Sequence, residues 1–443
     1  MVIMPNVRVN ILISLCFLMQ AQFVFANQPW TLQECIDRAK TANLTIRQKQ
    51  LAIQQANIAL KTAQCQRLPS LSGSVHEGYN MGLSPSVSGV YSQSNASAAN
   101  LSVSLSLPLF TGFRIRNGII SAKCDLNASK ADKEQALQDM VIDVMAAYLQ
   151  VLLDKELTRS AQEQVRLSSK QADKAQRMIQ VGKLSRSELY DSQAQLAKDS
   201  ASLIKLQTDQ QLAVIDLTQL LQFERSTDFD ISASGIDTVC VLPDNADILY
   251  STALNGYPAI RSAQYRIDKA KADIGVARAG YWPTIDLLAG YYNGYYFYYN
   301  LEDGAKNTSF SKQFYQNQQQ VIGATLSVPI FSRLDVKHKV QTATLNMQQQ
   351  ELALETAKLT FYKTIQQICC RAVAAKGRLH SLQKEEEASQ IAYEAVLEKF
   401  EVGKANAFEV NEKQTALAKA VSERIQAKYD YLFACKTLEL YVK

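Results

Sequence analysis

The chain contains the same order of segments twice. Residues 46–71, IRQKQLAIQQANIALKTAQCQRLPSL, align without a gap to residues 260–285, IRSAQYRIDKAKADIGVARAGYWPTI, at an offset of 214. VGKLSRSELYDSQAQL at 181–196 aligns to VGKANAFEVNEKQTAL at 402–417 at an offset of 221. Because an internal repeat means that one structural unit is built twice, it constrains the fold more than any other feature. The seven-residue difference falls between the aligned segments, so a loop there has grown while the helical parts kept their length.

Each repeat is predicted to run helix, strand, polar loop, strand, long helix, turn and helix. Strict alternation of apolar and polar residues, typical of a β-strand with one apolar face, is clearest at 98–107. The four strands are predicted near 71–77, 98–107, 285–295 and 321–328. A proline at each strand-to-helix junction is expected to end the strand there. These prolines are Pro69, Pro108, Pro283 and Pro329.

The helical segments predict a long coiled coil. As a helix, residues 111–181 would span about 105 Å, and residues 185–223 and 31–67 would together span about 114 Å. Two shorter helices can therefore stack end to end beside one long helix. In the long segment, apolar residues recur at the 4-3-4-3 spacing of a coiled-coil seam. They are Leu137, Val141, Val144, Tyr148 and Val151.

The N-terminal segment reads as a secretory signal peptide. Arg8 precedes the apolar run 11–19, and Val24 and Ala26 fit a cleavage site after Ala26. The run is too short to span a bilayer, and no later segment approaches the roughly 20 uninterrupted apolar residues that a membrane helix needs. The exported chain is therefore expected to cross a membrane only by strands.

The repeat and the leader predict four parts. They are a signal peptide at 1–26, a first repeat at 27–223, a linker at 224–245 and a second repeat at 246–443. The linker lacks a helical pattern and is expected to lie halfway along the helical rod.

Composition argues against several classes of protein. The net charge is +5, and removal of the leader with its single arginine leaves about +4, which is too balanced to indicate a nucleic-acid partner. Seven of the eight cysteines follow the leader without CxxC spacing, so neither a disulfide framework nor a zinc site is predicted, and most are expected to be small buried residues. His76, His338 and His380 are isolated, and no HExxH, P-loop or GxSxG motif occurs. An enzyme is not expected, and no cofactor or metal is predicted.

Four strands cannot stand alone in a bilayer, because unpaired edges would leave backbone groups unsatisfied in hydrocarbon. Dimers, trimers and tetramers would give 8, 12 or 16 strands, all compatible with closed barrels. The leucine side of residues 100–110 is expected to face lipid and the serine side water. The lipid-facing residues are Leu101, Val103, Leu105 and Leu107. The aromatic run 290–299 predicts anchors at a membrane boundary, or else a Tyr-rich protein-binding surface.

With its repeats, proline-bounded hairpins and the opening WTLQECIDRAKTANLTI, the mature chain resembles the TolC-like outer-membrane efflux family. The resemblance implies a mainly α fold with a small transmembrane β part, and a homotrimer with a 12-stranded barrel and a long α-helical tunnel. It places the protein in the outer membrane of a Gram-negative bacterium, reaching into the periplasm. It also implies a periplasmic adaptor and an inner-membrane transporter as partners, docking near the helix-to-helix turns. The turn residues are Val181, Gly182, Lys183, Val402, Gly403 and Lys404. Gly182 and Gly403 are expected to supply the positive φ that a tight helix-to-helix reversal needs.

Acidic residues follow both turns. Glu188 and Asp191, like Glu409 and Glu412, are three apart and therefore share a helix face. All four are candidates for an acidic gate at the periplasmic entrance, and by resemblance Glu409 and Glu412 match aspartates that ring the closed entrance in studied relatives. An alternative is helix capping, since Ser185 precedes Glu188 by three residues and an asparagine precedes Glu409 likewise.

The sequence therefore predicts a passive exit duct of a tripartite efflux or type I secretion system. The alternative is an outer-membrane adhesin or structural coiled-coil protein that displays a Tyr-rich loop. A soluble periplasmic scaffold is disfavoured by the alternating strands.

Overall fold

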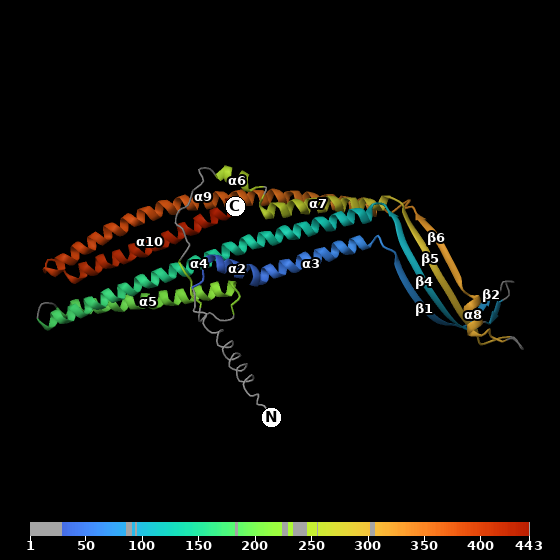
Figure 1. Ribbon diagram of the computed structural model, residues 1–443, viewed down its shortest axis with the longest axis horizontal. Coiled ribbons are helices and arrows are strands. Elements are labelled where there is room, and N and C mark those ends of the chain that lie inside the picture. Colours follow the sequence, from blue (N-terminus) through green and yellow to red (C-terminus); the bar gives the residue numbers. More distant parts are fainter. Residues whose placement is uncertain are drawn as a thin grey trace, which may run out of the picture. The chain divides into compact units, whose positions relative to one another are not determined.

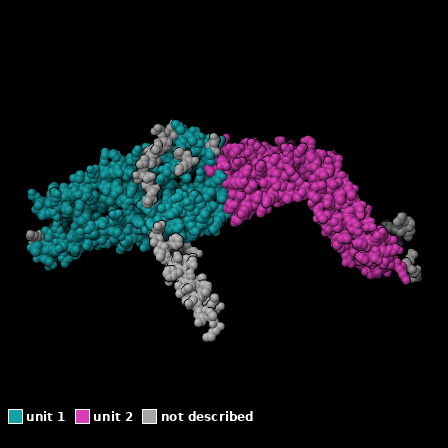
Figure 2. Space-filling view, in the orientation of Figure 1, with its two compact units in different colours: residues 1–49, 133–257, 358–443 teal, residues 50–132, 258–357 magenta. Residues whose placement is uncertain are grey.

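The computed structural model describes residues 29–85, 91–93, 95–181, 185–223, 229–233, 246–254, 256–301 and 306–442. The chain divides into two compact units (Figure 2). Unit 1 holds residues 1–49, 133–257 and 358–443, and unit 2 holds residues 50–132 and 258–357. Each sequence repeat contributes to both units. The predicted signal peptide lies outside the described residues.

Unit 2 contains one four-stranded antiparallel sheet. Each repeat supplies a pair of its strands, and the pairs join in the order β1-β4-β5-β6 (Figure 1). All four predicted strands are confirmed to within a few residues. Their bounds are β1 Ser70–Asn80, β4 Ala96–Thr111, β5 Thr284–Tyr298 and β6 Gln319–Ser327.

The register puts the leucines and the serines of β4 on opposite faces. Leu105 pairs with Leu71 of β1 and with Ala289 of β5, and antiparallel partners point to the same side of a sheet. On the other side, the Ser74 and Ser102 Oγ atoms are 2.7 Å apart. The predicted alternation is therefore confirmed for β4 and its partners in β1, whereas Leu288 of β5 lies on the serine face opposite Ser106.

Pro108 does not end its strand, which corrects the prediction for this proline. β4 continues to Thr111, and its pairing with β5 shifts register between Pro108 and Phe110. β1 pairs with β4 only as far as Ser106. Beyond that position β4 forms backbone hydrogen bonds with β5 alone. A residue without an N–H is accommodated at such an edge or bulge. The other three prolines lie outside the strands, as predicted.

The polar loops contain structure that the sequence did not indicate. The first holds a short hairpin of β2 Leu83–Pro85 and β3 Tyr91–Gln93, and the second holds α8 Phe310–Gln316. β6 pairs with β5 only up to Tyr292, which leaves the end of β5 without a strand neighbour on that side. Side-chain amides replace the missing strand there. Asn317 donates to the carbonyl of Gly294, Gln313 bonds both backbone groups of Tyr296, and Asn307 bonds both of Tyr298.

The long helices occur as predicted. α4 Arg114–Gln180 and α9 Asp335–Glu401 each have 67 residues. They turn back into α5 Arg186–Leu220 and α10 Ala407–Val442, which lie along them in unit 1 (Figure 1). The repeated sequence thus builds two helical hairpins of matching length.

The predicted single helix at 31–67 is instead two helices, α2 Leu32–Ala42 and α3 Leu44–Cys65. Asn43 between them has an extended backbone, with ψ 127°, and its Oδ1 accepts the Thr45 N–H at 2.8 Å. This asparagine ends one helix and caps the next. The second repeat is broken at the aligned place, between α6 Ala246–Ala253 and α7 Pro258–Arg278, and α7 continues into the short η1 Ala279–Tyr281.

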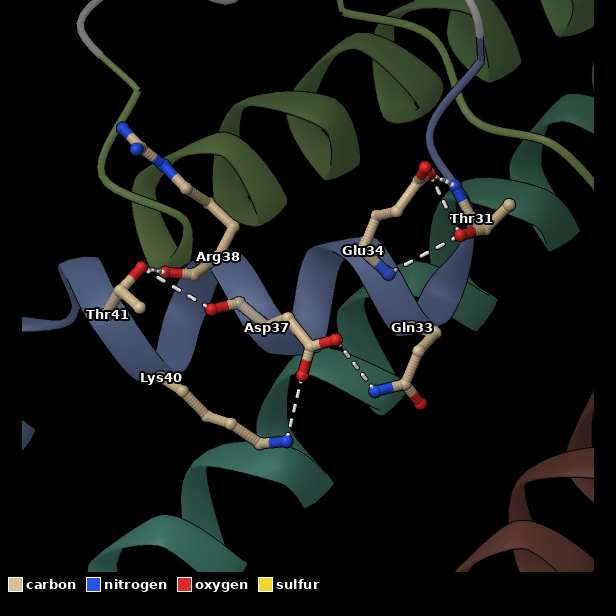
Figure 3. A network of polar contacts seen from close by, with 7 residues as sticks. All are labelled: Thr31, Gln33, Glu34, Asp37, Arg38, Lys40 and Thr41. Atoms are coloured by element: carbon tan, nitrogen blue, oxygen red, sulfur yellow. Dashed lines mark hydrogen bonds and ion pairs between the residues drawn. The ribbon is translucent and has the colours of Figure 1, made fainter.

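The first turn of α2 is closed by a capping box (Figure 3). The Glu34 carboxylate accepts the Thr31 N–H at 2.8 Å, and the Glu34 N–H donates to the Thr31 hydroxyl at 3.4 Å. The hydrogen bonds that the Thr31 N–H and hydroxyl donate to the Glu34 carboxylate lower the pKa of Glu34. One turn later Asp37 bonds Gln33 and Lys40 on the same helix.

The core of unit 1 is formed by the predicted coiled-coil seam. Val144, Tyr148 and Val151 are buried, while Leu137 and Val141 are half-buried against them. The Tyr148 hydroxyl lies 2.9 Å from the Trp30 carbonyl oxygen and 2.5 Å from that of Ser232. This core tyrosine therefore fixes the described part of the linker, 229–233, beside the start of α2.

Within the described residues, α4 is by length and composition alone long and apolar enough to cross a membrane, and 44% of its most apolar window is buried inside the protein. The buried seam residues Val144 and Tyr148 account for an apolar stretch in a helix that packs in a protein core.

The cysteines are less uniformly buried than expected. Cys35 and Cys435 are buried, but Cys65 and Cys370 are exposed on helices. Among the described cysteines, Cys35, Cys65, Cys124, Cys369 and Cys370 are free thiols.

Candidate functional site

The turn between α9 and α10 is a Schellman motif. Gly403 has φ +75°, its N–H donates to the Phe400 carbonyl at 3.1 Å, and the Lys404 N–H donates to the Lys399 carbonyl at 2.8 Å. Gly403 therefore has the positive φ that the sequence predicted for it. In the matching turn of the first repeat, Gly182 and Lys183 lie outside the described residues.

Large apolar side chains are exposed at both hairpin tips. Val181 and Tyr190 at the α4/α5 tip, and Val402 and Phe408 at the α9/α10 tip, are between 65% and 70% exposed. Most of the surface of each side chain is uncovered within a single chain. They give both tips an apolar surface of the kind that marks protein contacts.

The first turn of α5 confirms the capping interpretation of Glu188. Its carboxylate accepts the Ser185 N–H at 3.0 Å, and its own N–H donates to the Ser185 hydroxyl at 3.4 Å. This capping box satisfies helix N–H groups that would otherwise lack partners. Asp191, one turn later, is exposed.

The first turn of α10 is capped differently. Asn406 accepts the Glu409 N–H at 2.9 Å through its side chain, so the asparagine is the cap. Among the described residues, the Glu409 carboxylate has no hydrogen bond or ion pair. Glu412 pairs with Lys413 at 3.0 Å, a neighbour that the sequence interpretation did not consider. Glu409 and Glu412 are both exposed.

A buried polar cluster, which the sequence interpretation missed, joins three helices close to these tips. Ser168 of α4 bonds the Asp199 carboxylate of α5, and Gln414 of α10 donates to the Ser168 hydroxyl at 3.1 Å. Gln164 and Gln195 also donate to Asp199, at 3.2 Å and 2.8 Å. Ser168 and Gln414 are each 1% exposed. Polar residues at core positions of a helical repeat are the signal that would have indicated this cluster.

A salt bridge further along joins the two hairpins. Lys428 of α10 lies 2.9 Å from the Glu156 carboxylate of α4. Burial tends to raise the pKa of Glu156, but hydrogen bonds from Lys428 and Tyr429 outweigh it, so the pKa lies below its usual value. Burial, together with the bond to Glu156, raises the pKa of the Tyr429 hydroxyl. The hairpins are therefore held together by polar contacts that separation would break.

The sheet divides the aromatic run, which the sequence predicts to supply membrane-boundary anchors or a protein-binding surface, between its two faces. Tyr292 pairs with Ser102 and therefore lies on the serine face, whereas Tyr291 pairs with Val103 and lies on the leucine face. All four predicted lipid-facing residues share that leucine face. The strand thus divides its tyrosines between two surfaces.

Metal binding is not indicated in the part of the chain that the structure describes. Nowhere in it do three or more His, Cys, Asp or Glu side chains form a group that could hold a metal ion.

The chain thus combines an antiparallel sheet, in which β1 and β4 present a leucine face and a serine face, with long paired helices. The sequence profile of the outer membrane efflux protein family matches residues 35–221 and 249–442. The chain belongs to this family. The predicted mainly α fold with a small β part, the outer-membrane localisation and the resemblance are thereby confirmed, while the trimer and the 12-stranded barrel stay predictions.

Relatives and solved structures agree with this membership. The chain is 20% identical to the outer membrane efflux protein BepC of Brucella suis, over 87% of this chain and 79% of BepC. It is 23% identical to CyaE of Bordetella pertussis, where the match covers 58% of this chain and about half of the relative, 52%. The fold is similar to that of the outer membrane protein VceC of Vibrio cholerae, with a TM-score of 0.77, 15% identity, and coverage of 93% of this chain and 94% of VceC.

Proposed function

We propose that three copies of this chain form an outer-membrane exit duct for a tripartite efflux or type I secretion system. The observation that carries this proposal is the open sheet. β1 and β6 are its outer strands, and each has a strand neighbour on one side only. In a bilayer these edges must be paired, and β6 of one copy beside β1 of the next closes the sheet. Three copies give 12 strands.

Exposed apolar residues on the helices next to these strands in the sequence support the same assembly. Leu51 and Ile58 of α3, and Leu345 and Leu352 of α9, are seven residues apart within each helix and more than half exposed. Seven-residue spacing makes a stripe suited to packing against another helix. Because α3 leads into β1 and α9 follows β6, pairing β6 with a neighbour's β1 also brings α9 close to the neighbour's α3. One arrangement then covers both the strand edges and the stripes.

Charge on the α9 stripe tests this assembly. Leu352→Asp should reduce the fraction of chains that form trimers in detergent, because a desolvated carboxylate in the stripe has no partner. Asn346→Asp adds the same charge at an exposed position about 100° around the helix from Leu345, outside the stripe, and should leave the trimer intact. Light scattering with the micelle contribution subtracted measures the stoichiometry. A parent protein that scatters as a monomer or dimer contradicts the proposal.

Passage through the duct is tested in planar bilayers. A duct conducts ions when the purified protein is reconstituted, whereas an adhesin or a structural coiled coil does not. The family match gives no support to these alternatives. Relatives are named for alkaline protease secretion in Pseudomonas aeruginosa and for pyoverdine export in Pseudomonas putida, so cargo in this family includes polypeptides and small molecules.

The hairpin tips are the proposed docking site for a periplasmic adaptor, which links the duct to an inner-membrane transporter. The exposed Val402 and Val181 supply apolar contacts there, and the Gly403 turn fixes the shape of one tip. Val402→Asp should abolish export in cells while the trimer still forms in the outer membrane. If export persists in the Val181→Asp/Val402→Asp double variant, docking lies elsewhere.

A further inference from the structure

Two tyrosines of β5 fold back onto glycines of the same strand. A Cβ atom on Gly290 would lie 2.6 Å from Cε2 of Tyr292, and a Cβ atom on Gly294 would lie 3.0 Å from Cε2 of Tyr296. The first distance is shorter than carbon atoms tolerate, and the second is tight. Each ring therefore occupies space that a side chain at the glycine would need. The arrangement occurs twice along β5, as Gly-Tyr-Tyr at 290–292 and again at 294–296.

Both rings lie on the hydroxyl-lined face of the sheet. Tyr292 pairs with Ser102, and Gly290 pairs with Ser104. The Tyr296 hydroxyl lies 3.4 Å from Oδ1 of Asn100, the residue that pairs with Gly294. Both tyrosines are partly exposed, Tyr292 to 41% and Tyr296 to 39%. Each ring thus leans along the strand over its glycine and still presents a surface to its surroundings.

We propose that Tyr292 and Tyr296 line the lumen of the strand barrel, and that Gly290 and Gly294 seat their rings against its wall. The proposal rests on the proposed function, since the serine face becomes a lumen only when copies of the chain close the barrel. Residues repeated around the barrel narrow the passage from several directions at once. Rings held on the wall leave the passage wide, and rings pushed off it constrict the passage.

Gly323 provides a matched control on the same face. It pairs with Leu288 of β5. Leu288, Gly290 and Tyr292 are alternate residues of β5 and therefore lie on the same face of the sheet. A Cβ atom on Gly323 would meet nothing within 4 Å. Alanine therefore adds the same methyl group at Gly290 and at Gly323, but displaces a ring only at Gly290.

Polymer exclusion measures the width of this part of the duct independently of the periplasmic entrance. Poly(ethylene glycol) of graded size is added to the bilayer compartment that faces the loops between the strands, and the largest polymer that enters and changes the channel current is recorded. Gly290→Ala should lower this size limit, and Tyr292→Ala should raise it. The Gly290→Ala/Tyr292→Ala double variant should match Tyr292→Ala, because the displaced ring is absent. Gly323→Ala should match the parent.

Two results overturn the inference while leaving the duct intact. In the first, the largest polymer that enters is the same for the Gly290→Ala and Tyr292→Ala channels as for the parent. In the second, Gly290→Ala and Gly323→Ala change this polymer size by the same amount. Tyr292→Ala only removes atoms from a partly exposed side chain, so this variant is expected to assemble. Its polymer size limit can therefore be measured even if Gly290→Ala fails to assemble. Failure of the proposed function looks different, because the parent protein then forms no channels at all.

Discussion

At the start of α10, neighbouring polar side chains have separate tasks. Asn406 caps the helix, Lys413 pairs with Glu412, and the Glu409 carboxylate is exposed without a described partner. In the proposed trimer, Glu409 and Glu412 of three chains would form a ring of six carboxylates. Like charges held close together oppose one another's ionisation and attract cations.

Removing Glu412 should weaken block of the channel by divalent or trivalent cations added on the periplasmic side. Glu412→Ala should do so with little loss of stability, because the ion pair with Lys413 is an exposed one. Glu409→Ala should behave similarly, since Asn406 carries the capping bond. Asn406→Ala should instead cost about 0.5–2 kcal/mol of unfolding free energy without changing block. Single-channel recording and chemical unfolding separate the two effects. Unchanged block and cation selectivity in the Glu409→Ala/Glu412→Ala variant would show that these residues form no gate.

Glu156 should make the stability of the hairpin pair depend on acid pH. Its pKa in the folded protein lies below its usual value of 4.5, so the folded state binds the proton less readily than the unfolded state. The stability it contributes is present above about pH 4.5 and is lost as the pH falls through the folded-state value. Thermal unfolding from pH 7 to pH 3 should show a smaller decline in Glu156→Gln than in the parent protein.

The comparison with the parent protein matters because Asp154 acts in the opposite direction. Burial raises the pKa of that carboxyl, so its protonation favours the folded state as the pH falls. Asp154 is present in both proteins, so its contribution cancels when the pH dependence of unfolding in the Glu156→Gln variant is subtracted from that in the parent. Parallel pH profiles would contradict the assigned role of the Lys428 salt bridge.

At the scale of elements, β4 shows how alternation becomes two surfaces with different surroundings. Leu105 pairs with Leu71 and Ala289, whereas Ser104 pairs with Ser72 and Gly290. Adjacent residues of the same strand therefore belong to an apolar and a polar face. In the proposed barrel these faces contact lipid and water.

An arginine at Leu105 should hinder insertion into the outer membrane more than an arginine at Ser104. A basic charge near the bilayer midplane on the lipid face costs roughly 2–4 kcal/mol, while a lumen position remains hydrated. Cell fractionation with an antibody against the chain measures the amount in the outer membrane. Equal loss in both variants would remove the assignment of the leucine face to lipid.

At the scale of the whole molecule, the duplicated sequence gives two strand hairpins and two helical hairpins from one chain. The duct proposed from them is passive, so the identity of its cargo follows from the pump to which it is coupled. A strain lacking the protein should become sensitive to compounds that the coupled pump exports. Growth on a panel of antibiotics, bile acids and metals measures this, with complementation by the parent gene as the control. Wild-type growth across the panel, with protein secretion also unchanged, would count against an export role.

The sequence by itself determined the features that depend on local pattern. Strand alternation, the long helices, the positive φ of Gly403 and the Ser185 cap all follow from spacing and residue type over a few positions. The order of these segments also predicted the family that the profile match confirmed.

Only the tertiary structure decided which distant side chains meet. Gln414 reaches Ser168 across 246 positions, and Gln313 fills the edge of β5 where β6 has not begun. The exposure of Leu345 and Leu352 is likewise visible only once the neighbouring helices are in place. Periodicity shows that a residue repeats on a face, but whether that face is covered depends on packing with segments far away in the chain. For the same reason, the seating of Tyr292 on Gly290 required the ring position as well as the strand pattern.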